Sequence, residues 1–390
     1  MISHLKSAKH RETPGSNLVV LLFAAMVMDS VNLPGTGLPA NSIAMGFVAA
    51  YAILFRRGNG LALPRWAPAL VLAIPGWLLI ASVTNGAVDF RRVLSVALYA
   101  AVILVVALSR VNSVQIARGL GIAVVVGVVL GLVGPWAGGY GDRLTGPFGD
   151  PNSAGFNLAV FTALAFPSFS ATWRRNWLVA IAVLGIVLTQ SRTTMVTTLI
   201  MILWIVLFRY RAPILAFLLL LVPIVWISTS SWLDSAFSDR AGSDALRGRI
   251  TAAELQDVAL SPWAGNGAGT ARIFVGGHEF FYHNSYLAIR AEAGWVGLLL
   301  VLSVLALVIL ALVRLPRRLR NPYYEVAIIG VAICAINVGE ILLTLTAAIA
   351  VGTALRYVVV SRHSLKLEAG STPLARPQIT ESRSRRRMGR

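Results

Sequence analysis

Four arginines and one histidine are the polar residues best suited to chemistry in this 390-residue chain. The arginines are Arg143, Arg192, Arg247 and Arg249, and the histidine is His283. An arginine side chain stays charged at any relevant pH and donates two parallel hydrogen bonds from a planar fork, which suits it to phosphate groups. A histidine titrates near neutral pH and can take a proton from a hydroxyl group. Together, these residue types predict binding of a diphosphate and activation of an acceptor hydroxyl.

Each of these residues also has a simpler interpretation. Arg192 lies in a very short connection between two apolar segments, so it could extend to the headgroup layer without a specific ligand. The loop arginines could form ion pairs, and a lone loop histidine is more often only hydrogen-bonded. The available carboxylates are Asp234, Asp239, Asp244, Glu254 and Asp257. The diphosphate interpretation therefore requires the arginines to face one compartment together.

Other catalytic patterns are missing from the sequence. It contains no G-x-S-x-G turn and no H-E-x-x-H pair, and the Asp150-Pro151-Asn152 segment has a rigid proline inside the letters of a metal signature. His278-Glu279 with His283 is poorly spaced for a metal site. The single cysteine, Cys334, excludes an internal disulfide and a thiolate zinc cluster. We therefore expect neither a metal nor a cofactor.

The composition indicates a membrane protein. Hydrophobic residues make up 57% of the chain and charged residues 13%, with a mean hydropathy of +0.74, whereas soluble domains carry about a quarter charged residues. The net charge of +18 does not predict a nucleic-acid partner, because that requires a basic face on a soluble module. Charge-free windows predict an all-α fold, a polytopic bundle of about twelve transmembrane helices. The predicted spans are 17–32, 38–55, 67–84, 93–109, 119–137, 155–170, 176–190, 193–208, 212–229, 286–313, 324–337 and 341–360.

Basic residues predict the orientation of these spans. Placing both termini in the cytoplasm puts most of the 34 lysines and arginines on that side, as the positive-inside rule requires. The arginines named above and His283 then face the outside. The first span is expected to be a retained helix, not a cleaved signal peptide. The predicted organisation is a cytoplasmic segment (1–16), nine spans (17–229), a large external loop (230–284), three spans (285–360) and a disordered basic tail attracted to anionic membrane lipids (361–390).

The large external loop has features of a structured, functional segment. It contains a helix-compatible stretch at 250–260 and a glycine-rich piece at 265–269. Just beyond it, Arg290 and Glu292 lie inside the tenth predicted span. Charges are costly there, so each is expected to have a partner or a water-filled cavity.

Several short patterns resemble the O-antigen ligase and polymerase superfamily of bacterial membrane glycosyltransferases. The patterns are Gly146-Pro147-Phe148 with Asp150-Pro151-Asn152, Gln190-Ser191-Arg192, Gly248-Arg249 followed by Pro262 and Gly265-Asn266-Gly267-Ala268-Gly269, and His283-Asn284-Ser285-Tyr286-Leu287 followed by Glu292 and Gly294. The family commonly has a tryptophan shortly after its loop arginine, where this chain has Ala252 and Ala253. The choice between Arg247 and Arg249 as that arginine therefore stays open.

The resemblance implies a GT-C-like fold and a metal-independent glycosyltransferase. Its donor would be a polyprenyl-diphosphate-linked glycan, and its acceptor a lipid or glycan hydroxyl at the outer face of the cytoplasmic membrane. The implied roles are diphosphate binding by Arg192 and Arg249, with Arg247 and Arg143 nearby, acceptor activation by His283, and substrate orientation by Asn284, Asn152 and Glu292. Ligation, polymerisation and transfer to protein are not distinguished. The alternatives are a transporter or flippase of lipid-linked or anionic solutes and a non-catalytic scaffold.

Overall fold

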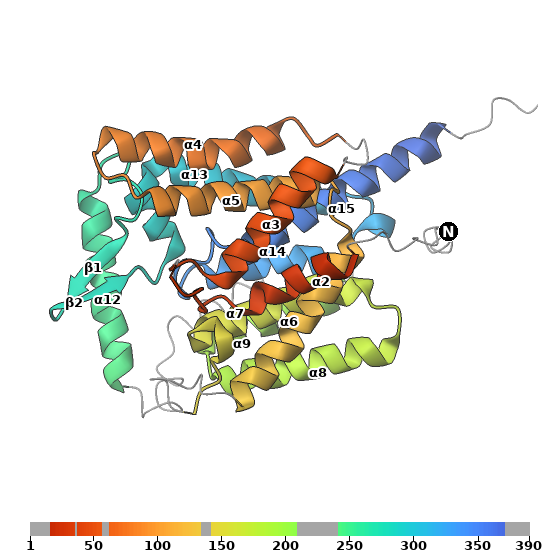
Figure 1. The fold of residues 1–390 in the computed structure, drawn as a ribbon, viewed down its shortest axis with the longest axis horizontal. Helices are drawn as coiled ribbons and strands as arrows, with labels where there is room; N and C mark the ends of the chain where they lie inside the picture. Colours follow the sequence, from red (N-terminus) through yellow and green to blue (C-terminus); the bar gives the residue numbers. More distant parts are fainter. Residues whose placement is uncertain (1–15, 36, 57–61, 134–141, 209–240, 371–390) are drawn as a thin grey trace, which may run out of the picture.

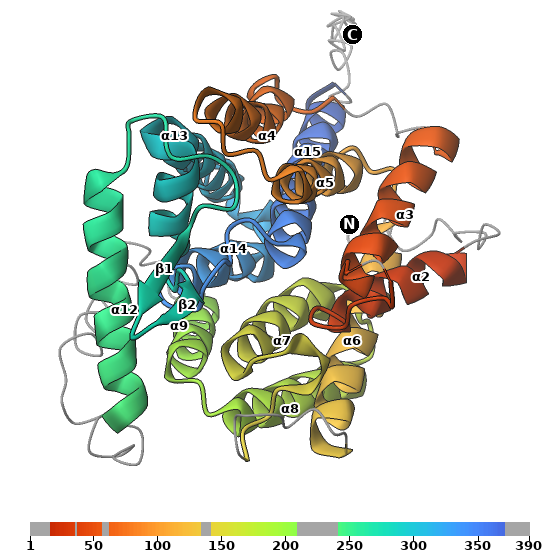
Figure 2. The ribbon, with the colours of Figure 1, turned by 60° about the vertical axis from the view of Figure 1, so that its left-hand side comes forward.

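The structure, a computed structural model, describes residues 16–35, 37–56, 62–133, 142–208 and 241–370. These residues form a bundle of helices that run mostly side by side, with a two-stranded hairpin at one end (Figure 1). The turned view in Figure 2 shows α4, α5, α13 and α15 grouped on one side and α6, α7 and α8 on the other. The helices are α2 (Ser16–Ala24), α3 (Ala40–Phe55), α4 (Trp66–Thr84), α5 (Phe90–Ala107), α6 (Ser113–Val133), α7 (Pro151–Ala165), α8 (Thr172–Thr189), α9 (Arg192–Phe208), α12 (Ala241–Leu260), α13 (Ser285–Val313), α14 (Pro322–Cys334) and α15 (Leu345–Gly370).

The predicted all-α class is confirmed for the described residues, with β1 (Arg272–Val275) and β2 (His278–Phe281) as a small antiparallel addition. Helices α4, α5, α6, α13 and α15 are long and apolar enough to cross a membrane. The chain is therefore a polytopic helical membrane protein. The predicted span 212–229 and the first part of the large external loop lie outside the described residues, so the count of twelve spans stays a prediction.

Polar caps set the starts of the helices that border the site. Asp89 caps α5 by accepting from Arg92 N (3.1 Å). Asp150 caps α7, where Pro151 occupies the first helical position. Asn284 caps α13, its Oδ1 accepting from the backbone N–H groups of Tyr286 and Leu287. Short polar side chains satisfy N–H groups that have no partner within the helix, so these positions fix where each helix begins.

Small residues let the helices approach closely. A Cβ at Gly119 of α6 would lie 2.6 Å from the backbone oxygen of Val20 on α2. A Cβ at Gly155 of α7 would lie 2.4 Å from the hydroxyl of Thr194 on α9. Close contact at small residues is the usual source of helix association in membranes, because lipid removes the hydrophobic driving force. The Gly155 contact brings the starts of α7 and α9 together.

Two predicted boundaries need correction. The first helical segment ends at Val27, not at 32, and Asp29 beyond it accepts a hydrogen bond from Asn41 (2.7 Å). The predicted disordered tail begins ten residues too early, because α15 continues to Gly370. Arg318 donates to Glu368 in this added part (2.6 Å), and such an ion pair stabilises a polar helical extension. Residues 371–390 and the segment before Ser16 lie outside the described residues.

Candidate active site

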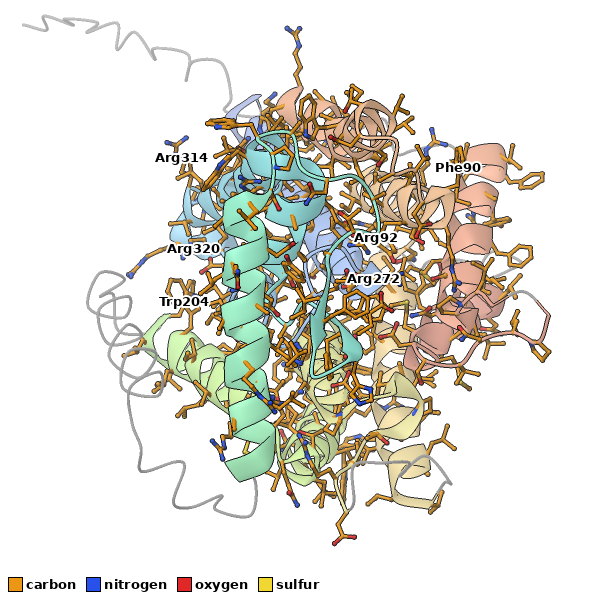
Figure 3. All side chains as sticks on the ribbon, turned by 90° about the vertical axis from the view of Figure 1, so that its left-hand side faces the viewer. Phe90, Arg92, Trp204, Arg272, Arg314 and Arg320 are labelled. Atoms are coloured by element: carbon orange, nitrogen blue, oxygen red, sulfur yellow. The ribbon has the colours of Figure 1, made fainter. Side chains whose placement is uncertain are left out.

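Helix α12 lies across one end of the bundle, which Figure 3 views from the front. Its predicted core, 250–260, is helical as expected, and the helix is longer than predicted. Ile250 and Glu254, one turn apart, are both buried. Ile250 packs in a small core with Ile273 of the hairpin and Tyr282, whose hydroxyl donates to Asp257 of α12. This satellite core fixes α12 against the segment that carries His283.

His283 lies between β2 and the start of α13. Its backbone N–H donates to Glu254 Oε1, and its carbonyl accepts from Gly339 N (2.7 Å). The two contacts hold the residue between α12 and the connection from α14 to α15. The imidazole Nδ1 is buried and lies 3.8 Å from Glu254 Oε1, while the His283 side chain as a whole is 32% exposed. The backbone of His283 is therefore held by hydrogen bonds, whereas its side chain is partly open to solvent.

Burial and a neighbouring cation lower the pKa of His283. Desolvation has the largest effect, and the Arg247 guanidinium adds to it. A hydrogen bond with the Phe281 backbone and the charge of Asp150 act in the opposite direction. Because the cationic form is disfavoured, the imidazole is neutral at pH 7 and has a lone pair that can accept a proton. Burial also raises the pKa of Glu254, although the backbone N–H groups of His283 and Asn284 favour its charged form.

The two candidate arginines of α12 have different surroundings. Arg247 is half-buried and close enough to His283 to influence its charge state. Arg249 is exposed and lies about 100° around the helix from the inward-facing Ile250. The carboxylates of Asp257 and Glu254 bind Tyr282 and the His283 backbone instead of an arginine. Arg247 is therefore the one of the two with an electrostatic influence on the histidine, and the choice between Arg247 and Arg249 as the functional arginine stays a prediction.

The two other predicted motifs meet each other at the same end. Ser191 Oγ donates to Asn152 Oδ1 (2.7 Å), so the segment before α9 is fastened to the first turn of α7. Arg143 Nε donates to the Thr189 carbonyl (3.0 Å), and Arg192 is half-buried at the first position of α9. The connection from α14 to α15 contacts both groups, because Asn337 Nδ2 donates to Thr193 Oγ1 (3.5 Å) and Gly339 N donates to the His283 carbonyl. The starts of α7, α9 and α13 therefore lie at the same end of the bundle.

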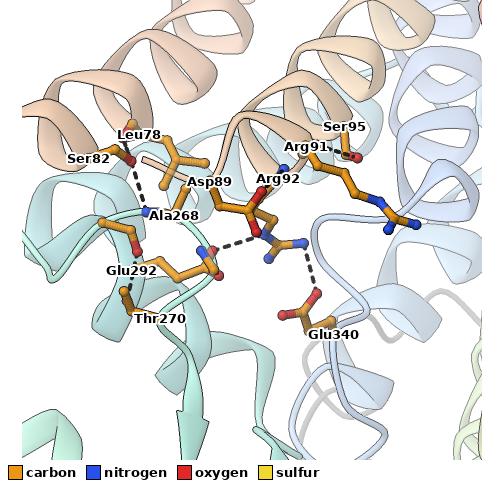
Figure 4. A network of polar contacts seen from close by, with 12 residues as sticks. Leu78, Ser82, Asp89, Arg91, Arg92, Ser95, Ala268, Thr270, Glu292 and Glu340 are labelled. Atoms are coloured by element: carbon orange, nitrogen blue, oxygen red, sulfur yellow. Dashed lines mark hydrogen bonds and ion pairs between the residues drawn. The ribbon is translucent and has the colours of Figure 1, made fainter. Parts of the chain in front are cut away.

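Glu292 and Arg290 have the partners that their burial requires, as predicted. Glu292 Oε2 accepts from Arg92 Nε (3.1 Å), and the Arg92 Nη1 lies 2.8 Å from Glu340 Oε2 (Figure 4). Arg290 donates to the carbonyls of Pro262 and Ser261 (2.8 and 3.1 Å). With Glu292 Oε1 also accepting from a backbone N–H, both of its oxygens are occupied inside the protein. Its predicted role in orienting substrate stays a prediction.

The glycine-rich turn 265–269 is used to hold helices together. Its five N–H groups all donate within the protein, to Pro262 O, Ala291 O, Glu292 O, Ser82 Oγ and Glu292 Oε1 in chain order. The turn fits against a kink in α13 at Gly294, which has φ 65° and ψ −166°. A loop that cradles phosphate needs unpaired N–H groups. This turn therefore braces α13 against α4 and does not bind phosphate through its backbone.

The described residues contain no group of three or more His, Cys, Asp or Glu side chains that could hold a metal ion. His278 is exposed on the hairpin, and its neighbour Glu279 pairs with Arg272 (3.3 Å). Cys334 is buried.

Three residues of this end were not predicted as site residues: Arg92, Glu340 and Glu254. Glu254 was considered only as an ion-pair partner for an arginine, and its burial one turn from Ile250 shows its inward position. Arg92 carried a usable signal, because it lies at the boundary of a predicted span, three residues after the Asp89 cap. Glu340 lies in a short connection between apolar spans, which is the same signal that identified Arg192.

Residues 177–302 match the O-antigen ligase family model. The matched segment runs from α8 to the first half of α13, so it includes Arg192, both α12 arginines and His283, while Arg143 and Asn152 precede it. The predicted resemblance is confirmed over these residues, and it implies membrane glycan ligase or polymerase activity on lipid-linked glycans. No curated protein and no solved structure matched the chain.

Proposed function

We propose that this protein transfers or polymerises a glycan from a polyprenyl diphosphate carrier onto an acceptor hydroxyl at the outer face of the cytoplasmic membrane. One observation supports the proposal: the connection from α14 to α15 contacts both the His283 carbonyl and, through Asn337, Thr193 at the start of α9, so His283 and Arg192 lie at one end of the bundle. Arg247 is close enough to the imidazole to lower its pKa. The family match over α8 to α13 supports it independently.

In the proposed reaction, neutral His283 accepts the proton of the acceptor hydroxyl. The hydroxyl oxygen forms a new bond to the anomeric carbon of the donor glycan, and the bond from that carbon to the diphosphate oxygen breaks. The carrier leaves as a diphosphate anion. Arg192 and Arg247 stabilise its growing negative charge, with Arg143 and Arg249 as further cations on this side.

Hydrogen bonds from fixed cations can stabilise a leaving group strongly, because they need no reorganisation at the moment of reaction. Arg192 begins a helix whose preceding residue is hydrogen-bonded to α7, and Arg247 lies on a helix packed against the satellite core. Both cations therefore sit on rigid elements. The Asn284 and Asn152 amides serve as a helix cap and as a hydroxyl acceptor in the present structure, so we propose that they orient substrate through the segments they fix.

The test is transfer by purified protein in liposomes, with a lipid-linked glycan extracted from a source strain as donor. We expect His283→Asn and Arg192→Ala to reduce turnover by at least about 100-fold, as loss of a general base or of an oxyanion-stabilising group does. Arg272→Ala is the matched control, since Arg272 is an exposed arginine at the same end that pairs with Glu279.

Undiminished product from the folded His283→Asn protein would refute the proposed role of the histidine. Movement of the glycan lipid across the vesicle without a new glycosidic bond would instead support a transporter.

A further inference from the structure

A groove between α6 and α8 opens at the end of the bundle opposite His283. Helix α8 runs from Thr172 to Thr189, and its C-terminal residue contacts Arg143 at the site end. The groove lies near the other terminus, about 27 Å away along an 18-residue helix. Its cavity volume of about 560 Å³ is within the range of about 300–1,000 Å³ found for small-molecule sites. Residues lining it include Arg118, Ile122, Val125, Ser170, Arg174 and Trp177.

One part of the groove is suited to an anion. Arg118 from α6 and Arg174 from α8 both line it and are exposed. Ser168 and Ser170, just before α8, also line the groove. Helix α8 begins there, and its cap residue, Ala171, provides no side-chain hydrogen bond to the first-turn N–H groups. Two guanidinium groups and an uncapped helix N-terminus form an environment that favours a phosphate group.

The rest of the groove is suited to hydrocarbon. Trp173 and Trp177, on successive turns of α8, are each 62% exposed. The Arg174 guanidinium lies 5.3 Å from the Trp173 ring centroid, so the charged and aromatic parts adjoin. Ile122 and Val125 of α6 extend the apolar wall away from the arginines. Exposed tryptophans beside basic residues mark the level of lipid headgroups, where the polar and apolar parts of a lipid meet.

We propose that this groove binds an anionic glycerophospholipid from the membrane leaflet at that end, with its phosphate between Arg118 and Arg174 and an acyl chain along Ile122 and Val125. Basic pockets between transmembrane helices bind such headgroups. A zwitterionic lipid brings the same phosphate, but it also carries an ammonium group that the two guanidinium groups repel, and a neutral lipid has no anion for them to attract. Free phosphate would leave the apolar part of the groove and both tryptophans uncovered. The charge and the apolar wall together therefore favour an anionic lipid.

The test is native mass spectrometry of the full chain in a nonionic detergent, titrated with phosphatidylglycerol or phosphatidylcholine. We expect wild type to retain phosphatidylglycerol in preference to phosphatidylcholine. The double variant Arg118→Gln/Arg174→Gln should bind phosphatidylglycerol about 30-fold more weakly, which corresponds to about 1 kcal/mol for each cation near a lipid headgroup. Ile122→Trp keeps both arginines but fills the apolar wall, and it should also weaken binding.

The control is Arg314→Gln/Arg317→Gln, because both arginines are exposed at the same end of the bundle, just after α13, but lie outside the groove. The affinity of this control for phosphatidylglycerol should stay within about threefold of the wild-type affinity, since detergent removes the charged membrane surface. An equal loss in the control would show general electrostatic attraction and overturn the proposal. Unchanged binding in the groove variants, equal retention of phosphatidylcholine, or displacement by inorganic phosphate would each overturn it as well.

Discussion

Substitution of Arg92 by methionine is the sharpest test of how the site end is held together. The Arg92 side chain is 14% exposed and bridges Glu292, which is 2% exposed, and Glu340, which is 29% exposed. These three residues join α5, α13 and the connection from α14 to α15. Gly339, next to Glu340, donates to the carbonyl of His283. Loss of the arginine should therefore destabilise the fold and loosen the histidine.

The size of this destabilisation follows from the burial of the ion pair between Arg92 and Glu292. Removing one partner of a buried ion pair costs about 3–5 kcal/mol, because the remaining charge is left uncompensated. In Arg92→Met, the buried Glu292 carboxylate would be left uncompensated in this way. Its hydrogen bond from Gly269 N–H (2.9 Å) remains, so we expect a cost near the lower end of that range. The partly exposed Glu340 adds at most about 1 kcal/mol. We expect Arg92→Met to lower the free energy of unfolding by about 3–4 kcal/mol.

The assay is unfolding by SDS in mixed micelles, followed by tryptophan fluorescence. Arg91→Met is the control, because Arg91 is the exposed neighbour on the same helix and, among the described residues, its side chain donates to the Gly37 carbonyl alone. This variant should cost about 1 kcal/mol or less. Glu292→Gln added to Arg92→Met should recover at least about 1 kcal/mol, as expected for coupled partners. A cost below about 1 kcal/mol for Arg92→Met, or strict additivity with Glu292→Gln, would contradict the reasoning.

Three further predictions concern single residues. Arg247→Gln removes a cation that disfavours the imidazolium, so the pKa of His283 should rise. The acid limb of the kcat/KM profile should then move to higher pH. An acid limb that stays at the same pH would show that Arg247 is too far from the imidazole to affect its charge. Gly294→Ala should destabilise the detergent-solubilised protein by about 3 kcal/mol in a thermal assay. The reason is that Gly294 has φ +65° and a Cβ there would lie 1.9 Å from a backbone oxygen. Gly46→Ala is the control and should be neutral, because a Cβ at Gly46 would have nothing within 4 Å. Ser191→Ala removes the partly buried hydrogen bond that joins the starts of α7 and α9, and it should lower the free energy of unfolding by about 1 kcal/mol in the SDS assay and lower turnover. Unchanged stability and turnover would show that this contact does not position α9.

The spans could be predicted because a charge in hydrocarbon is costly wherever it occurs in the chain. The window 67–84 corresponds to α4 at Trp66–Thr84, and the window 38–55 to α3 at Ala40–Phe55. The ends of helices were less predictable where contacts with residues distant in sequence determine them. The last ten residues of α15 are mostly polar, and one of them, Glu368, pairs with Arg318, 50 residues away. No local pattern indicates that pairing.

The site could be predicted in part, since the predicted topology grouped Arg192 and His283 on one side of the membrane, and the structure has both at one end of the bundle. Which residues contact these side chains depends on the direction in which each side chain points around its helix, and the predicted topology does not specify that direction. Arg247 and Arg249 are two residues apart in sequence but about 160° apart around a helix. The inward face of α12 became evident only from the burial of Ile250 and Glu254. The pairing of Arg92 with Glu292 spans 200 residues and has no sequence signature.

The shared surroundings of His283 and Arg247 lead to a test that connects donor binding with proton transfer. In the free protein, burial and Arg247 lower the pKa of the imidazole below its usual 6.5. If the donor diphosphate binds beside Arg247, its negative charge offsets the cation and the pKa of His283 rises in the complex. The histidine would then become a stronger base only once a leaving group is in place.

This coupling predicts different pH profiles for two kinetic parameters. The acid limb of kcat/KM reports the free protein, whereas that of kcat reports the complex. The acid limb of kcat should therefore lie at higher pH than that of kcat/KM, and Arg247→Gln should narrow the gap by raising the lower limb. Coinciding limbs in the unmodified protein would mean that no diphosphate charge reaches His283, because a dianion near the ring cannot leave its proton affinity unchanged.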